Sequence, residues 1–250
     1  MVGPGSGYLA CGDVDTGRMS EPEDIVEAIC EVLNPAPQDL AGKRIVITAG
    51  PTHEPIDPVR FIGNRSSGKM GIALAGEAAR RGAEVTLVLG PTSLDVPHGV
   101  ECVRVQTAAE MLQAALGAFQ TADAAICAAA VADYTPVSPA DHKLKKANER
   151  LDRIELIETV DILAELSRQK GERRVIGFAA ETDNVVEYAK RKLARKGCDA
   201  IIANDVSRAD SGFGTDTNKA WIVSTTGTKE LPVLTKPQLA DTILDLLQNL

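Results

Sequence analysis

A run of small and polar residues between positions 63 and 71 has the composition of a phosphate-binding loop. It reads Gly63-Asn64-Arg65-Ser66-Ser67-Gly68-Lys69-Met70-Gly71 and opens a helical pattern. Backbone N–H groups can approach a phosphate closely at glycines, and the dipole of the following helix favours the anion. The run nearly matches GxxxxGK[ST], but Met70 replaces the hydroxyl that would hold Mg²⁺. The alternative is a tight helix–strand turn with a serine N-cap, and the helix-start chemistry favours the phosphate site.

Five lysines are further candidates for binding anions. Lys143, Lys145 and Lys146 cluster after a predicted strand, and Lys192 and Lys196 share one helix face at i,i+4 spacing. In a chain with a net charge of −8, this cluster favours a phosphate clamp over a solvated loop. For Lys192 and Lys196, the residues alone favour a simpler interpretation, in which both complement the partial negative charge of the helix C-terminus.

Asp133 and Phe178 each stand at a predicted strand end. By default such a carboxylate caps a loop and such a phenylalanine belongs to the core. Because the chain has only four Phe, three Tyr and one Trp, Phe178 at a strand end becomes a candidate for packing on a base.

The elements that must position these residues alternate between β and α patterns from Leu40 onward. Strands are predicted at Ile45–Thr48, Val85–Leu89, Val100–Val105, Ala124–Ala130, Val175–Ala179 and Ala200–Ala203. Helices are predicted at Met70–Arg81, Ala108–Phe119, Asp161–Gln169, Val185–Lys196 and Leu239–Leu247. Arg153–Ile157 alternates like an edge strand, and Ala220–Ser224 and Glu230–Val233 bracket a hairpin signal at Thr226-Gly227.

Continuous apolar strands alternating with helices indicate a parallel sheet covered on both faces. The predicted fold class is therefore α/β, with a Rossmann-like, mostly parallel sheet, helices on both faces and a C-terminal β-hairpin. Ligands of such sheets bind beyond the C-terminal strand ends, which here are loops 49–69, 131–146, 178–184 and 204–218.

Residues 1–39 differ from the rest of the chain. Gly3-Pro4-Gly5-Ser6-Gly7 has loop composition, which Gly12 and Gly17 continue. A helix is expected over Glu21–Leu33 with Ser20 as its N-cap, and Asn34-Pro35-Ala36-Pro37 is typical of a linker. The predicted division is a tail and linker over 1–39 and a domain over 40–250.

Composition excludes several classes of function. A pI near 5.0 and few aromatic residues argue against a nucleic-acid partner. No apolar run reaches the roughly 20 residues of a membrane span, and no secretion signal is seen. Five scattered cysteines without a CxxC pair, and three His residues far apart, offer no metal-ligand spacing and favour a cytoplasmic location.

Several blocks in fixed order resemble the phosphopantothenate–cysteine ligase (phosphopantothenoylcysteine synthetase) domain. They are Thr48–Thr52, Asp57–Phe61, Asn64–Lys69, Ala129–Tyr134, Lys143–Lys146, Gly177–Thr182 and Ala203–Val206. The resemblance covers residues 40–250. It implies an enzyme that joins 4′-phosphopantothenate to L-cysteine in coenzyme A biosynthesis, using CTP and an acyl-cytidylate intermediate and releasing pyrophosphate and CMP.

The resemblance also implies roles for individual residues. Asn64, Lys143 and Arg60 would be catalytic, and Asn64, Ala129 and Ala130 would bind phosphopantothenate. CTP would contact Gly50, Ser66, Gly68, Gly71, Cys127, Ala128, Ala129, Asp133, Lys143, Val160, Asp161, Ile162, Leu163, Phe178, Lys192 and Lys196. The cofactor would be Mg²⁺, held mainly through the triphosphate, with its protein ligands open. Val160 departs from the family pattern, which commonly has proline there.

The first residues resemble the end of a second domain. Ala10-Cys11-Gly12-Asp13, followed by Gly17-Arg18-Met19, is similar to the substrate clamp of the flavin-dependent phosphopantothenoylcysteine decarboxylase domain. Such a domain is fused before the ligase in bifunctional bacterial proteins, and its clamp cysteine, here Cys11, donates a proton. The FMN site and catalytic histidine of that domain are not in this chain, so we expect no decarboxylation by it.

Two other functions remain open alternatives. One is an NAD(P)-dependent reductase, against which the missing GxGxxG and the missing ribose-binding carboxylate argue. The other is a non-catalytic subunit that binds a flavoprotein, against which Asn64 and Lys143 argue. The resemblance further implies a homodimer, with the loop 131–146 and the hairpin 219–233 as candidates for reaching across.

Overall fold

The computed structural model describes residues 3–8, 11–33, 35–145, 152–208, 210–212 and 214–250. Ala10, Asn34 and Lys146, which appear in the motifs above, lie outside these residues. By its internal contacts the chain divides into two units, Met1–Asp39 and Leu40–Leu250.

The first unit contains one hairpin and one helix. Strands β1 (Gly5–Tyr8) and β2 (Val14–Arg18) pair antiparallel, and helix α1 spans Pro22–Leu33. The prediction of the helix is confirmed, whereas the prediction of a loop over the glycine-rich start is wrong. Backbone pairing between two short segments holds these residues, and composition alone does not reveal such pairing.

The second unit is built on one eight-stranded sheet. Its order is β14-β13-β12-β11-β8-β3-β6-β7. The parallel strands are β3 (Arg44–Ala49), β6 (Glu84–Leu89), β7 (Val100–Arg104), β8 (Ala124–Cys127), β11 (Arg174–Glu181) and β12 (Ala200–Asp205). Numbered by their order in the chain and counted from β7, these six parallel strands are arranged 3-2-1-4-5-6, as in dinucleotide-binding sheets. The order in which successive strands are added reverses between β3 and β8.

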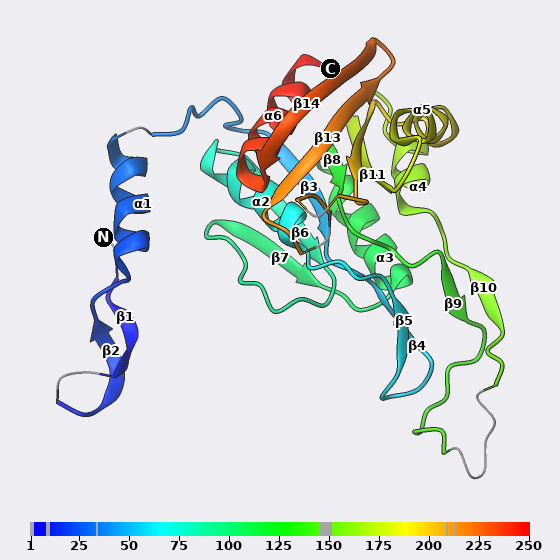
Figure 1. Ribbon diagram of the computed structural model, residues 1–250, viewed down its shortest axis with the longest axis horizontal. Coiled ribbons are helices and arrows are strands. Elements are labelled where there is room, and N and C mark those ends of the chain that lie inside the picture. Colours follow the sequence, from blue (N-terminus) through cyan, green and yellow to red (C-terminus); the bar gives the residue numbers. More distant parts are fainter. Residues whose placement is uncertain (1–2, 9–10, 34, 146–151, 209, 213) are drawn as a thin grey trace. The chain divides into compact units, whose positions relative to one another are not determined.

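Helices cover both faces of this sheet, as Figure 1 shows. On one face lie α2 (Lys69–Arg80) and α6 (Lys236–Asn249), joined by ion pairs from buried Arg81 to Asp241 and Asp245. On the other lie α3 (Ala108–Phe119), α4 (Ile162–Arg168) and α5 (Val185–Lys196). Within β3 the side chains alternate between the two cores, Ile45 and Ile47 in one and Val46 in the other. The predicted α/β class is confirmed.

The C-terminal hairpin is also confirmed. Strand β13 (Thr217–Ser224) runs antiparallel to β12, and β14 (Gly227–Thr235) pairs with β13 around a two-residue turn. Gly227 has a φ of 151°, a value that favours glycine.

Two small ribbons lie beside the main sheet. One pairs β4 (His53–Pro55) with β5 (Phe61–Gly63), and the other pairs β9 (Tyr134–Pro136) with β10 (Leu156–Glu158). The predicted edge strand Arg153–Ile157 is thus wrong in its bounds, and the strand that is present belongs to a two-stranded ribbon. The predicted strand Ala124–Ala130 leaves its ladder with β11 after Cys127, although the N–H groups of Ala128 and Ala130 still bond to β3 and Gly50.

Among the described residues, no helix has the length and apolar character that crossing a membrane requires.

Candidate active site

A cavity of about 760 Å³ opens at the carboxyl ends of β3, β8 and β11, where the strand order reverses. Most residues predicted to bind a ligand line it. They are Asn64, Ser66, Gly68, Gly71, Cys127, Ala128, Ala129, Ala130, Asp133, Val160, Asp161, Ile162, Leu163, Phe178, Lys192 and Lys196. Segments far apart in the sequence meet here because parallel strands end at the same edge of the sheet.

The first turn of α2 forms one wall of this cavity. Gly68, the N-cap, has a φ of 83°, and its side-chain-free backbone passes beside Gly50. A Cβ at Gly71 would lie 2.3 Å from the Cβ of Ala49, so glycine allows the helix to approach β3 closely. The first turn contains no acidic residue. Its N–H groups and the helix dipole therefore favour an anion in the cavity.

Asn64 ties the glycine-rich segment to the end of β8. Its Nδ2 donates to the carbonyl oxygens of Ala130 at 3.2 Å and Val131 at 2.9 Å. An amide nitrogen carries two hydrogens, so both donors have partners. To donate to an acyl oxygen, as the resemblance implies, Asn64 must exchange one of these carbonyls for the substrate.

The segment Cys127–Ala130 supplies backbone rather than reactive groups. The N–H of Ala129 donates to Thr48 Oγ1 at 3.4 Å, and that of Ala128 donates to the Thr48 carbonyl at 3.1 Å. Burial raises the pKa of the Cys127 thiol to about 12. This cysteine is therefore protonated at neutral pH and packs as a small apolar group, not as a nucleophile.

Lys192 and Phe178 meet at the end of β11. Lys192 Nζ donates to the Phe178 carbonyl at 2.7 Å, and burial lowers the pKa of this lysine. Phe178 is partly buried, packs against the core and also lines the cavity, so its ring belongs to the core and still reaches the site where a base was expected. Gly197 caps α5 through a backbone bond to Leu193. Lys192 thus lines the cavity and bonds to β11, not to the last carbonyls of its own helix.

Lys196 reaches the start of α4. Its ammonium forms an ion pair with Asp161, whose other oxygen caps α4 by accepting from the N–H of Ala164 at 2.9 Å. Ile162 and Leu163 are buried in the core beneath, while Val160 is exposed at the rim. The Val160–Leu163 block therefore forms one wall of the cavity, where the Asp161 carboxylate is paired with the Lys196 ammonium.

Arg60 and Lys143 do not line the cavity. Arg60 forms an ion pair with buried Asp57, and its Nη2 donates to the Leu144 carbonyl at 2.9 Å. Asp57 also accepts the backbone N–H groups of Arg60 at 2.8 Å and Leu144 at 3.2 Å. Hydrogen bonding from Arg60 holds the pKa of Asp57 well below its ordinary value. Arg60 thus fixes the segment on which exposed Lys143 stands.

Two other predicted residues lie elsewhere. Gly50, with a φ of 78°, sits beneath Gly68 and beside Gly90 rather than among the lining residues. Cys11 belongs to the first unit, where it is exposed and its thiol donates to Asp13 at 3.7 Å.

Two lysines that line the cavity were given no role by the sequence analysis. Lys69 stands in the glycine-rich motif itself, and Lys236 begins α6. Lys236 Nζ donates to the carbonyls of Gly212 and Thr215 and to Asn218 Oδ1, and burial lowers its pKa to about 8. No local pattern indicates Lys236, because its partners belong to β13 and to the connection that precedes it.

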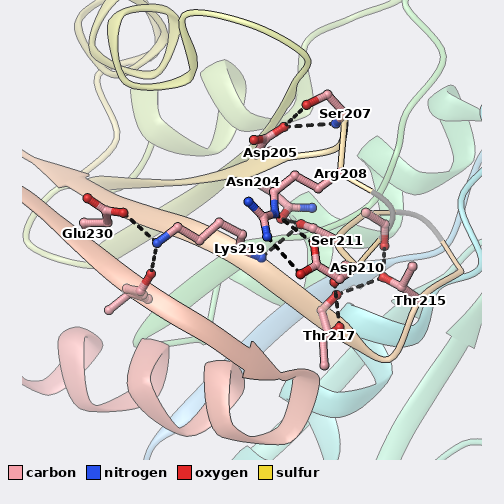
Figure 2. Close-up of polar contacts among 12 residues, drawn as sticks. Asn204, Asp205, Ser207, Arg208, Asp210, Ser211, Thr215, Thr217, Lys219 and Glu230 are labelled. Atoms are coloured by element: carbon pink, nitrogen blue, oxygen red, sulfur yellow. Dashed lines mark hydrogen bonds and ion pairs between the residues drawn. The ribbon is translucent and has the colours of Figure 1, made fainter.

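Side-chain hydrogen bonds stabilise this connection between β12 and β13, as Figure 2 shows. Ser211 Oγ donates to Asn204 Oδ1 at 2.8 Å, and Thr217 Oγ1 donates to the Asp210 carbonyl at 2.6 Å. Asn204 and Gly212 also line the cavity. The carboxyl end of β12 is thereby fixed as a further wall.

The strand order, the crossing point and the polar cavity define a Rossmann-like α/β protein with a cavity at its topological switch point. Residues 40–250 match the model of the DNA/pantothenate metabolism flavoprotein C-terminal domain family. The chain belongs to this family.

Relatives and solved structures agree with this assignment. The chain is 49% identical over 247 residues to the coenzyme A biosynthesis bifunctional protein CoaBC of Bacillus subtilis, and 47% identical over 246 residues to that of Escherichia coli K12. These alignments cover 98% and 97% of this chain but only 61% and 60% of the relatives. The chain therefore spans about three fifths of their length.

Two solved structures share the fold. The C-terminal domain of a CoaBC protein matches with a TM-score of 0.70 and 47% identity, covering 83% of this chain and 94% of that one. The DNA/pantothenate metabolism flavoprotein of Streptococcus pneumoniae matches with a TM-score of 0.71 and 25% identity, covering 83% and 99%.

The bonds around Asp57 predict that this carboxylate holds the segment carrying Lys143. In Asp57→Asn the charge-assisted bonds to Arg60 and Leu144 weaken, so amide hydrogen exchange over residues 140–145 should become about tenfold faster or more. Mass spectrometry of peptides from this segment measures the change. The matched control is Asp141→Asn, which removes an exposed carboxylate of the same segment. Equal exchange in both variants would contradict the assignment.

Proposed function

We propose that this chain is the ligase part of a bifunctional coenzyme A biosynthesis protein, joining 4′-phosphopantothenate to L-cysteine at the expense of CTP. One observation carries the proposal. Most residues that the resemblance assigns to ligand binding line one cavity, which has a helix N-terminus on one side and Lys192 and Lys196 on the other. The relatives' description as coenzyme A biosynthesis proteins supports the pathway.

The proposed reaction has two steps. A carboxylate is a poor acylating agent because its leaving group would be oxide. Its oxygen therefore attacks the α-phosphorus of CTP, pyrophosphate leaves, and the acyl-cytidylate forms. The amine of cysteine then attacks the acyl carbon, the C–O bond to the phosphate breaks, and CMP leaves with the bonding electrons while the amine loses a proton.

Each wall of the cavity has a part in this proposal. The turn around Ser66, Gly68 and Gly71 receives the phosphates through N–H groups and the helix dipole. Phe178 packs on the base, while Lys192, Lys196 and Asp133 surround the nucleotide. Ala129 and Ala130 border phosphopantothenate, and Asn64 exchanges one backbone carbonyl for the acyl oxygen. Lys143, which stands outside the lining residues of its own chain, is assigned to the α-phosphorus by the resemblance.

Mg²⁺ is assigned to the nucleotide in this proposal. Within the described residues, no group of three or more His, Cys, Asp or Glu side chains could hold a metal ion. Phosphate oxygens are good Mg²⁺ ligands, so the ion enters on the triphosphate, where it supplies charge neutralisation. The chain contributes binding groups around the phosphates.

Release of pyrophosphate tests the proposed function. With CTP, phosphopantothenate, cysteine and Mg²⁺ all present, we expect continuous release, and at matched concentrations CTP should be turned over faster than ATP. Omitting cysteine should limit release to the amount of enzyme, because the acyl-cytidylate cannot be consumed. Omitting phosphopantothenate should abolish it. Release that does not require phosphopantothenate, or equal turnover of ATP and CTP, would contradict the proposal.

The two half-reactions should depend on different side chains. Lys143→Gln removes a cation near the α-phosphorus and should slow formation of the acyl-cytidylate. Asn64→Asp turns a donor toward the acyl oxygen into a carboxylate, which should slow amide formation by about 10²–10³-fold, the usual cost of one such donor. Rapid quench with labelled CTP should therefore show acyl-cytidylate accumulating in Asn64→Asp. Accumulation in Lys143→Gln instead would mean that the roles are reversed.

The proposed assembly is a homodimer through the two small ribbons. Phe61 on β5, and Leu156 and Ile157 on β10, expose 51%, 42% and 57% of their surfaces. Tyr134 and Val137 beside them are also exposed. Apolar side chains gathered on neighbouring ribbons favour burial against a second copy, whose segment 131–145 would then lie near the cavity.

Ile157→Glu should separate this dimer. Light scattering should give twice the 26.4 kDa chain mass for the wild type and one chain mass for the variant at micromolar concentration. The control is Val233→Glu, which adds the same charge at an exposed position of β14. Dissociation by Val233→Glu but not by Ile157→Glu would move the interface to the hairpin.

A longer protein that contains this chain, as in the relatives it matches, is proposed to carry the FMN-dependent decarboxylase as well. In that domain Cys11 would act as proton donor. FMN is not assigned to any residue of this chain.

A further inference from the structure

Lys69 lines the cavity, but its ammonium bonds to Asp216, a residue that does not line it. It follows the N-cap Gly68, and 33% of its side chain is exposed. Its Nζ donates to Asp216 Oδ1 at 2.6 Å and to the Gly214 carbonyl at 3.0 Å. The lysine thus bridges from the glycine-rich turn to the residues just before β13.

The backbone of Asp216 is held in place, whereas the ion pair of its side chain with Lys69 is exposed to water. Its backbone carbonyl accepts the N–H of Lys236 at 3.0 Å, so its position does not depend on Lys69. Its side chain is 86% exposed, and hydrogen bonding from Lys69 lowers its pKa. Exposed ion pairs contribute little stability because water screens both charges.

Phosphate groups compete well for such a lysine. A triphosphate at the start of α2 would place several negative charges within reach of the side chain, and charge-assisted bonds to phosphate are among the stronger ones. Lys236 keeps the carbonyls of Gly212 and Thr215, so the neighbouring backbone stays in place when Lys69 turns. Exchange therefore requires only the rotation of one long side chain.

We propose that Lys69 is a phosphate-binding residue of the nucleotide site and that Asp216 is its resting partner, which the bound triphosphate displaces. The inference rests on the proposed nucleotide function and adds to it a competition between a carboxylate of the chain and the ligand. Asp216 thereby weakens nucleotide binding while keeping the lysine beside the cavity.

A double-mutant cycle on the 250-residue chain tests this exchange. Isothermal titration calorimetry with MgCTP gives the Kd of the wild type, Lys69→Met, Asp216→Asn and the double variant. Lys69→Met should weaken binding about tenfold or more. Asp216→Asn should tighten it about 1.5- to 5-fold, the range of an exposed pair. In the double variant that gain should vanish, because no lysine remains to be released.

The matched control is Glu230→Gln. Lys219 and Glu230, drawn in Figure 2, form a pair at the same 2.6 Å on β13 and β14, and neither residue lines the cavity. This variant should leave the Kd unchanged. CMP, which lacks the outer phosphates, should bind Lys69→Met and the wild type equally.

Several results would overturn the inference. They are an unchanged Kd in Lys69→Met, weaker MgCTP binding in Asp216→Asn, and the same gain from Asp216→Asn with or without Lys69. The last result would mean general repulsion rather than exchange. If the folded wild type binds no CTP, the proposed function fails instead. The same cycle with inorganic tripolyphosphate then decides the assignment of Lys69.

Discussion

The contact between Gly71 of α2 and Ala49 of β3 is the constraint on which the site depends. A side chain at position 71 would collide with Ala49, so the helix can start where it does only with glycine there. Gly68 turns the chain into this helix with a positive φ, and Gly50 leaves room below it. The resulting position aims the first turn of α2 at the ends of β8 and β11. Asn64 then bonds to the carbonyls of Ala130 and Val131 beyond the end of β8, which ties the glycine-rich segment to the other side of the strand-order reversal.

Four lysines line this cavity of an acidic protein, and each of them has a hydrogen-bond or ion-pair partner in the chain. Lys192 has a backbone carbonyl, Lys196 has Asp161 at a helix start, and Lys69 has the exposed Asp216. Lys236 alone is satisfied by three neutral acceptors and remains buried. These partners hold the lysine side chains in place, and because some of the partners are neutral carbonyls, the positive charge at the cavity is only partly compensated. Anion binding thus depends on local charge, whereas the net charge of −8 says little about it.

Much of this arrangement could be predicted from the sequence, because much of it is local. Helices α3 and α5 were predicted with the same bounds, since their apolar periodicity and end signals are strong. Most cavity residues followed from the family resemblance, which local patterns alone did not supply. The three-residue ribbons could not be predicted, because strands that short depend on partners distant in sequence. Arg60 appeared as a reactive group, yet its charge is used on Asp57 at a turn, which no motif reveals. Lys236 was missed because its hydrogen-bond acceptors lie about 20 residues earlier in the chain, in β13 and the loop before it.

The outermost strand β14 has a consequence for how the protein behaves when crowded. Its sequence Gly227-Thr228-Lys229-Glu230-Leu231-Pro232 places two charged side chains and a proline on the open edge of the sheet. Proline lacks the N–H that an added strand would need, and charges resist being covered by another chain. Fibril-like growth by edge-to-edge addition is therefore blocked at this end of the sheet. At this edge, self-association is left to side-chain surfaces, which can form closed assemblies that stop growing.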